Sequence, residues 1–336
     1  MKPIKLGILG TGLAARDLHW PVLKQLKDLF EIIMVCSRCE ANVKEFAEMV
    51  GNVRYVQDYK TLLSEADIEA VDIILPVHLH YQAAKAAMEA GKHLILEKPL
   101  AATIAEAESL VALDEQYPQV KMVAENFRYR SALLRVKELL DKGSIGKPYA
   151  VFCDFVALID KSNPYANTKW RTEHTFPGGF VTDVGIHYTA QLRLLFGEII
   201  PGHASSRSIN PQIGKMDSFS LQFSTVDNAI GILNIFLSAK DYFQERTVIL
   251  GDKGTITAGQ VGSEFGDAKI AVFREGKTSE ESFQKDTGLI EEFKDFYRAV
   301  REGKKPASSI LEAYKDLKVI LDVLESGKQE DKTQIN

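Results

Sequence analysis

The sequence predicts an α/β domain with a doubly wound parallel sheet, followed by an α+β domain built on a mostly antiparallel open sheet. Up to about residue 125, short apolar runs alternate with stretches of helical period, as in a parallel sheet covered by helices. Beyond that point strands of alternating polarity dominate, and 336 residues are enough for two packed cores. We expect domains at residues 1–125 and 126–336, with the last helices free to pack back on the first domain.

Apolar runs and helix signals define the elements of the first domain. Strands are expected at residues 4–9, 32–36, 71–75, 94–96 and 120–124. Apolar residues recur at i, i+3, i+4 and i+7 from Val43 to Val50, which indicates a helix. Thr103 and Glu106 form a capping box that opens another helix, running towards Tyr117.

The second domain begins with a helix near residues 132–140 and continues mainly as strands. These strands are expected at residues 149–156, 219–224, 229–236, 247–250 and 270–273. Two helices follow. One carries Leu289, Ile290, Phe293, Phe296, Tyr297 and Val300 on a single face, and the other spans residues 309–324.

Composition argues against several classes of function. The formal net charge is −5 with no dense basic block, so we expect no nucleic-acid partner and no anionic membrane surface. Three cysteines cannot all pair, which favours a reducing compartment, and we expect a cytoplasmic protein. Cys36 and Cys39 form a lone C-x-x-C with no second pair, so packed thiols are favoured and no metal is expected.

A glycine-rich run lies between the first predicted strand and the first predicted helix. Gly10, Thr11, Gly12, Leu13, Ala14 and Ala15 fit the G-x-G-x-x-A pattern of a Rossmann dinucleotide-binding turn. Gly10 allows the tight turn, Gly12 lets the backbone approach a pyrophosphate, and the helix N-terminus attracts its charge. The alternative is a tight turn without a ligand.

The end of the second predicted strand indicates which dinucleotide binds. An NAD site usually has Asp or Glu there to bind the ribose 2′-hydroxyl, whereas this chain has Ser37 and Arg38. A hydroxyl and a guanidinium suit a 2′-phosphate, so NADP is favoured and NAD remains an alternative. Arg38 could instead be a solvated loop cation.

Several motifs in one order resemble the Gfo/Idh/MocA oxidoreductases. The run AGKHLILEKPL at residues 90–100 matches the family's E-K-P motif, and further matches lie at residues 124–129, 143–146, 170–171 and 178–187. The resemblance spans essentially the whole chain. Two positions depart from it: Val77 replaces an asparagine of the T-P-N-x-x-H motif, and Ala190 replaces an acid after His187.

The resemblance implies catalytic roles for Lys98, Asp183 and His187. Lys98 would bind the reacting oxygen, His187 would exchange the hydroxyl proton, and Asp183 would orient Lys98 or the substrate. The residues support this independently, since Lys98 follows a parallel strand and Asp183 and His187 are spaced i, i+4 on a predicted helix. The alternatives are a surface cation for Lys98, a helix N-cap for Asp183 and a core histidine for His187.

Further residues are implied to contact the cofactor. Besides the glycine run, Ser37 and Arg38, they are Pro76, His80, Glu97, Lys98, Asn126, Trp170 and Arg171. Trp170 would pack against the nicotinamide, with core packing as the alternative. Unranked candidates for sugar contacts are Asn163, Tyr165, Arg128 and Tyr242.

These observations predict an NADP-dependent oxidoreductase that acts on a sugar, polyol, cyclitol or diol. The first domain would bind NAD(P), and the second would bind substrate and form a homodimer or homotetramer. Two other functions remain open: a non-catalytic dinucleotide sensor or corepressor, and a reductase of a larger conjugated substrate.

Overall fold

The computed structural model describes residues 2–173, 176–262 and 266–330, which form two compact units. The first unit contains Met1–Glu125 and Leu289–Lys315, and the second contains Asn126–Gly288 and the chain from Asp316 onward. Helix α10 (Ile310–Glu330) therefore contributes its first six residues to the first unit and the rest to the second.

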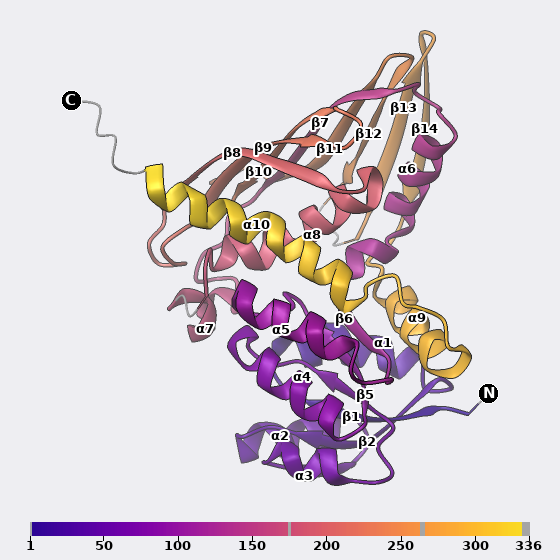
Figure 1. Ribbon diagram of the computed structural model, residues 1–336, viewed down its shortest axis with the longest axis vertical. Coiled ribbons are helices and arrows are strands. Elements are labelled where there is room, and N and C mark those ends of the chain that lie inside the picture. The colour runs from indigo at the N-terminus through magenta and orange to yellow at the C-terminus, as the bar shows by residue number, and fades with distance from the viewer. Residues whose placement is uncertain (1, 174–175, 263–265, 331–336) are drawn as a thin grey trace. The chain divides into compact units, whose positions relative to one another are not determined.

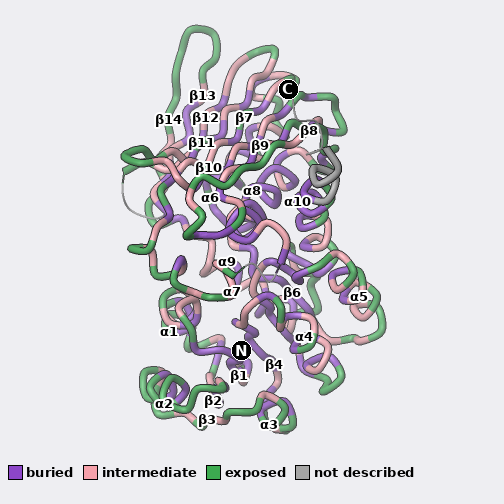
Figure 2. The backbone as a smooth tube through the Cα atoms, turned by 90° about the vertical axis from the view of Figure 1, so that its left-hand side faces the viewer, coloured by how far each residue is buried: buried purple, intermediate pink, exposed green. Residues whose placement is uncertain are grey.

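The first unit is built on a six-stranded parallel sheet (Figure 1). Its order is β3 (Arg54–Val56), β2 (Phe30–Cys36), β1 (Ile4–Leu9), β4 (Ala70–Ile73), β5 (His93–Glu97) and β6 (Lys121–Ala124). Both faces of the central strands are buried, as the purple course of β1 and β4 in Figure 2 shows. Burial on both faces explains why these strands are mainly apolar in the sequence, with Lys5 in β1 and the buried Asp72 in β4 as exceptions.

Helices cover this sheet. They are α2 (Glu40–Met49), α3 (Tyr59–Ser64), the 3-10 turn η2 (Val77–Leu79), α4 (His80–Glu89), α5 (Ile104–Asp114) and the returning α9 (Leu289–Glu302). Thr103 caps α5 by accepting a hydrogen bond from the Glu106 amide, as the capping box predicts. On α9, Phe293, Phe296 and Tyr297 pack against Phe30, so the predicted apolar face of this helix is confirmed.

The helix after the glycine-rich run is interrupted. Residues Ala15–His19 form a π-helical turn, η1, and only then does the α-helix α1 (Trp20–Gln25) begin. Pro21 lies in the first turn of α1, where its missing amide hydrogen is tolerated. The wider turn places His19 on the buried side, where it is 1% exposed.

The second unit is built on an eight-stranded sheet. The strand order is β14 (Lys277–Phe283), β13 (Ala268–Arg274), β12 (Gly254–Gln260), β11 (Gln244–Gly251), β7 (Pro148–Val156), β10 (Ile230–Phe236), β9 (Ser218–Thr225) and β8 (Ile199–Arg207). Only β7 and β10 pair in parallel, and all other neighbours are antiparallel. The predicted mostly antiparallel open sheet is therefore confirmed.

One face of this sheet is covered by helices α6 (Ser131–Asp141) and α8 (Phe180–Phe196). Shorter turns complete the unit: η3 (Asn126–Tyr129), η4 (Pro164–Asn167) and α7 (Lys169–Thr172). Asp286 caps α6 from far along the chain by accepting hydrogen bonds from the Ser131 and Ala132 amides. The other face leaves Phe152, Ile230 and Phe236 exposed.

Four strands lie outside the predicted set: β3, β8, β12 and β14. Three of them form sheet edges, where side chains need not be apolar, and β14 reads KTSEESF. β12 is rich in Gly and Thr, so it lacks a clear apolar period as well. Among the described residues, no helix is both long and apolar enough to cross a membrane.

Candidate active site

The glycine-rich turn connects β1 to η1. Gly10 has φ of +107°, and a Cβ there would lie 2.0 Å from the carbonyl oxygen of Ile74. Only glycine fits this conformation and this approach to the end of β4. Ala15, the last residue of the G-x-G-x-x-A pattern, is fully buried. Its small side chain allows the turn to pack closely against the sheet.

The same turn leaves room where a pyrophosphate would bind. A Cβ on Gly12 would have no atom within 4 Å. The adjacent Thr11 hydroxyl is buried and has no hydrogen-bond partner among the residues that the structure describes. Arg16 fixes the turn, because its Nε donates to the Thr11 carbonyl at 3.1 Å while its guanidinium pairs with Glu45 at 2.9 Å. An open cradle beside an unsatisfied hydroxyl and a helix start fits a phosphate group.

Ser37 and Arg38 follow the end of β2. Ser37 is half-buried and Arg38 is exposed. Within the part of the chain that the structure describes, Arg38 has no ion pair or hydrogen bond through its side chain. No acidic side chain occupies either position, so nothing at this strand end repels a 2′-phosphate.

The carboxyl end of β5 carries Glu97 and Lys98, both half-buried. Glu97 Oε1 lies 2.9 Å from His19 Nε2, and His19 Nδ1 lies 2.8 Å from Asp72 Oδ2 on β4. Burial alone raises the pKa of Glu97, but the hydrogen bond and charge of His19 outweigh it and lower that pKa. Neither His19 nor Asp72 is among the predicted site residues, although a histidine seven residues after Gly12 could have suggested one.

Pro76 and His80 lie after β4. Pro76 is half-buried, and His80 is 1% exposed with its ring nitrogens 2.8 Å from the carbonyls of Leu75 and Pro99. Burial lowers the pKa of His80, while the two carbonyls oppose that shift. His80 therefore links the backbone at Leu75 to the backbone at Pro99, the residue after Lys98. A direct contact of His80 with the cofactor stays a prediction.

In the second unit, α7 and α8 bring Arg171 and Asp183 together. Arg171 Nε donates to Asp183 Oδ2 at 2.8 Å. The guanidinium lies 3.9 Å from the Trp170 ring centroid and 5.0 Å from that of Tyr165. Asp183 is the fourth residue of α8 and Gly179 is the N-cap, which excludes the alternative of Asp183 as a helix cap.

His187 follows Asp183 by one helical turn on α8. It is half-buried, and its ring stacks on Phe127 with the centroids 4.7 Å apart. Asn126, one residue before Phe127, donates to the Thr287 carbonyl at 2.6 Å. The stacking restricts the orientation of the imidazole, and a role of His187 in proton exchange stays a prediction.

Three of the candidate sugar contacts have partners within the protein. Arg128 is buried and donates to both carboxylate oxygens of Asp316, at 2.7 and 2.6 Å, and Arg193 also binds Asp316. The Tyr242 hydroxyl donates to Gln244 at 2.5 Å. Asn163 caps η4 by accepting from the Tyr165 amide.

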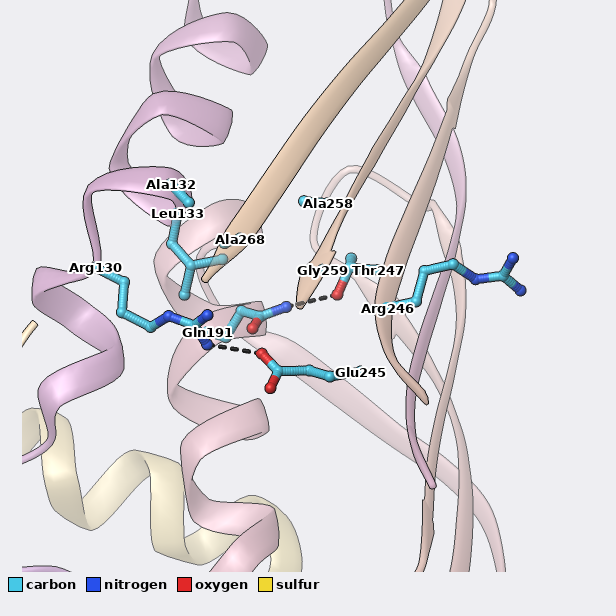
Figure 3. A pocket seen from close by; sticks show the side chains of 10 residues that line it. All are labelled: Arg130, Ala132, Leu133, Gln191, Glu245, Arg246, Thr247, Ala258, Gly259 and Ala268. Atoms are coloured by element: carbon cyan, nitrogen blue, oxygen red, sulfur yellow. Dashed lines mark hydrogen bonds and ion pairs between the residues drawn. The ribbon is translucent and has the colours of Figure 1, made fainter. Parts of the chain in front are cut away.

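A small cavity also lies in the second unit, between α6, α8 and the sheet (Figure 3). Arg130 points toward Glu245 at 2.7 Å and Gln191 toward Thr247 at 2.6 Å. Its volume of about 20 Å³ holds about one water molecule, so it is too small for a sugar.

No metal centre is found within the described residues, since no group of three or more His, Cys, Asp or Glu side chains could hold an ion. Cys36 and Cys153 are buried, and burial raises the pKa of these thiols to about 11 and about 12. Cys39 is exposed, so the C-x-x-C is not a packed pair of thiols as expected: only Cys36 is packed.

Known proteins resemble both units. Residues 4–125 match the family model for an oxidoreductase family with an NAD-binding Rossmann fold, and residues 133–257 match the GFO/IDH/MocA C-terminal domain. The crystal structure of an oxidoreductase from Thermotoga maritima is 35% identical, with a TM-score of 0.88 over 96% of each chain.

Two relatives extend the comparison. The Saccharomyces cerevisiae protein YMR315W is 29% identical over 91% of this chain and 90% of its own length. The Bacillus subtilis scyllo-inositol 2-dehydrogenase (NADP(+)) IolW is 29% identical over 59% of this chain and 53% of its own length. With both domain models matched, the chain belongs to the Gfo/Idh/MocA family and is an oxidoreductase with a Rossmann domain for a nicotinamide dinucleotide.

Proposed function

We propose that this protein is an NADP-dependent oxidoreductase that transfers a hydride between the nicotinamide and a carbinol or carbonyl carbon of a sugar, polyol, cyclitol or diol. The observation that carries the proposal is the cradle at Gly12, open to a ligand and lying next to the buried, unpartnered Thr11 hydroxyl. When bound, the dinucleotide supplies the hydride chemistry, and the chain supplies orientation and proton transfer.

Ser37 and Arg38 support NADP over NAD. A charged, forked guanidinium beside a hydroxyl can bind a 2′-phosphate through charge-assisted hydrogen bonds, each stronger than a neutral one. The name of the Bacillus subtilis relative, which includes NADP(+), is consistent with this choice. The other proposed cofactor contacts are residues 10–14, Pro76, His80, Glu97, Lys98, Asn126, Trp170 and Arg171.

For the chemistry, we assign Lys98, His187 and Asp183 as the reacting-centre residues. The Lys98 ammonium donates a hydrogen bond to the substrate oxygen and stabilises the negative charge that develops there. Imidazole exchanges protons near neutral pH, so His187 takes or returns the hydroxyl proton. Asp183, bound to Arg171, accepts a hydrogen bond from a substrate hydroxyl and thereby orients the substrate.

The polar groups of α7 and α8 favour a substrate rich in hydroxyls. Arg171 and Asp183 form a charged pair next to two aromatic rings, an arrangement that combines hydrogen-bonding groups with flat apolar surfaces. Sugars and cyclitols present both kinds of surface. The inositol named for the Bacillus subtilis relative belongs to this class.

A substrate panel tests the proposal. Sugars, cyclitols, ketoses and diols are offered with NADP or NADPH, and with NAD or NADH, and the absorbance of the reduced ring is followed. We expect turnover with at least one polyhydroxy compound and a higher kcat/KM with the phosphorylated cofactor. Binding of NADPH without turnover of any compound would contradict the proposed reaction, and equal use of NADH would contradict the assignment of Ser37 and Arg38.

We also propose that a second copy of the chain covers the exposed sheet face. Phe152, Ile230 and Phe236 are 39%, 60% and 37% exposed and lie on neighbouring strands β7 and β10. Exposed apolar residues grouped in this way are typical of an interface, and a homodimer is the simplest assembly, with a tetramer as the alternative. A cytoplasmic location stays a prediction.

A further inference from the structure

A chain of charged side chains runs beneath the end of β5. His19 lies between Asp72 on β4 and Glu97 on β5, at 2.8 and 2.9 Å. The His19 and Asp72 side chains are 1% and 0% exposed, and the Phe293 ring packs edge-on against the imidazole at 5.4 Å. The His19 and Asp72 side chains are therefore shielded from solvent, and His19 is hydrogen-bonded to both carboxylates.

The hydrogen-bond chemistry restricts how protons are placed. A neutral imidazole donates through only one nitrogen, whereas His19 has a carboxylate oxygen at each nitrogen. Both contacts are satisfied between charged groups only if the ring carries two protons. Burial alone lowers the pKa of His19, but the charges and hydrogen bonds of Asp72 and Glu97 outweigh it and raise that pKa well above its usual value.

Other charged groups lie around the Asp72, His19 and Glu97 side chains. Glu292 on α9 is fully buried, and within the described part of the chain neither of its carboxyl oxygens has a hydrogen-bond partner. Burial raises the pKa of Glu292 well above the usual value. Glu125 follows β6 and is also buried, and Lys98 and His80 lie close enough to lower the pKa of Glu97. Several acids thus surround one imidazole, and a protonated Glu292 reduces their negative charge.

Glu97 links this buried chain to the cofactor edge of the sheet. Its side chain is 15% exposed. Oε1 is bound to His19, while Oε2 has no hydrogen-bond partner among the residues that the structure describes. Glu97 is the last residue of β5, and ligands of parallel sheets bind at the carboxyl ends of the strands.

We propose that His19 and Asp72 are positioning residues: a buried imidazolium between Asp72 and Glu97 keeps the Glu97 carboxylate charged and its free oxygen available to a hydroxyl or amide donor of the cofactor. The proposal rests on the proposed function in one respect, namely that Glu97 contacts the bound dinucleotide. The new element is that His19 and Asp72, which are buried and do not touch the ligand, maintain the negative charge of Glu97.

The first test is the protonation state of His19 in the protein without nucleotide. Histidine labelled with ¹⁵N on its ring is observed by NMR, and the His19 signal is assigned by its loss in His19→Gln. At pH about 8, where an ordinary histidine is neutral, we expect both His19 nitrogens to carry protons. A neutral ring at that pH would overturn the proposal.

The second test uses Asp72→Asn, which keeps a hydrogen-bonding group of the same size beside His19 and removes the charge. It also keeps the proposal testable if His19→Gln does not fold. The matched control is Asp67→Asn, the same substitution at a side chain that is 70% exposed in the same unit. The dissociation constant for NADPH is measured by fluorescence from pH about 5.5 to about 8.5, a range that brackets the usual histidine pKa.

With Asp72→Asn, His19 loses the charge that contributes most to raising its pKa, so the ring loses its second proton at a lower pH than in the wild type and supports the charge of Glu97 less. Glu97 then takes up a proton at a higher pH than in the wild type. The ratio of its dissociation constant to the wild-type value should therefore rise as pH falls, by up to about tenfold per pH unit below the new pKa. Using the ratio cancels the titration of the cofactor's own 2′-phosphate. For Asp67→Asn the ratio should stay flat.

A flat ratio for Asp72→Asn, or an equal slope for both variants, would overturn the positioning role. These outcomes are separable from failure of the proposed function. If the wild-type protein bound no NADPH at all, the proposed function would fall while the NMR result still reported the charge of His19.

Discussion

Replacing Gly12 with alanine should weaken cofactor binding without loosening the fold. The added Cβ meets no atom within 4 Å, so the fold accommodates it. The same methyl group occupies the space through which a pyrophosphate would reach the backbone amides. Losing one charge-assisted hydrogen bond costs about 1.5–3 kcal/mol, which corresponds to about 10- to 150-fold in the dissociation constant for NADPH.

Gly10→Ala is the matched comparison, because the same methyl group is added two residues away. Here the Cβ would lie 2.0 Å from the Ile74 carbonyl oxygen at φ of +107°. Strain at such a backbone conformation costs about 1–3 kcal/mol, and the overlap adds about as much again. We expect Gly10→Ala to unfold at clearly lower temperature, whereas Gly12→Ala should match the wild type or slightly exceed it.

The assays are NADPH titration by fluorescence and thermal unfolding followed by circular dichroism without nucleotide. The reasoning would be refuted if Gly12→Ala bound NADPH like the wild type. It would equally be refuted if Gly10→Ala were as stable as the wild type, since the turn would then not be the constrained structure described above.

Three further predictions concern the buried charges and the exposed sheet face. Glu292→Gln should be more stable than the wild type, by an amount that grows as pH rises above about 4.5. Burial raises the pKa of the Glu292 carboxyl in the folded state, so above that pH the unfolded wild type loses this proton more readily than the folded protein. The free energy of unfolding of the wild type therefore falls by up to about 1.4 kcal/mol per pH unit. Asp316→Leu should lose about 3–5 kcal/mol in urea unfolding, because it leaves the guanidiniums of Arg128 and Arg193 buried without their shared carboxylate. Phe236→Asp should lower the sedimenting mass from that of a dimer to that of a monomer, since a charge in an apolar interface is costly.

Each of these has a result that would count against it. For Glu292→Gln it is a stability difference that does not change between about pH 5 and about pH 8, a range over which a carboxyl group titrates only if its pKa is raised. For Asp316→Leu it is an unfolding midpoint equal to that of the wild type. For Phe236→Asp it is an unchanged mass, with Tyr55→Asp on the edge strand of the first unit as the control that should not alter assembly.

The sequence allowed most of the fold to be predicted, because burial on both faces makes the central strands of a parallel sheet mainly apolar. The edge strands β3, β8 and β14 were not predicted, because their side chains need not be apolar. β14 carries charged side chains because one side of it has no neighbour, so its period-2 signal is weak. The π-helical turn before α1 was also missed, since neither propensity nor apolar period distinguishes it from an ordinary first turn.

For the site, local motifs were informative and long-range partners were not. The glycine pattern located the turn because its residues lie within six positions of one another, although the atom that excludes a side chain at Gly10 belongs to Ile74, far along the chain. The Asp72–His19–Glu97 chain joins residues 53 and 78 positions apart, so no spacing in the sequence indicated it. The same is true of the Arg171–Asp183 pair, which depends on how α7 meets α8.

The most direct test of the account is the rate of hydride transfer in a single turnover by Lys98→Ala, once a substrate is known. NADPH is mixed with enzyme and substrate, and the loss of reduced-ring absorbance is followed by stopped flow, alongside the dissociation constant for NADPH. The account predicts a rate lower by about 10²- to 10³-fold with cofactor affinity within a few-fold of the wild type, because Lys98 stabilises charge that develops only during the reaction. A wild-type rate in Lys98→Ala would contradict it.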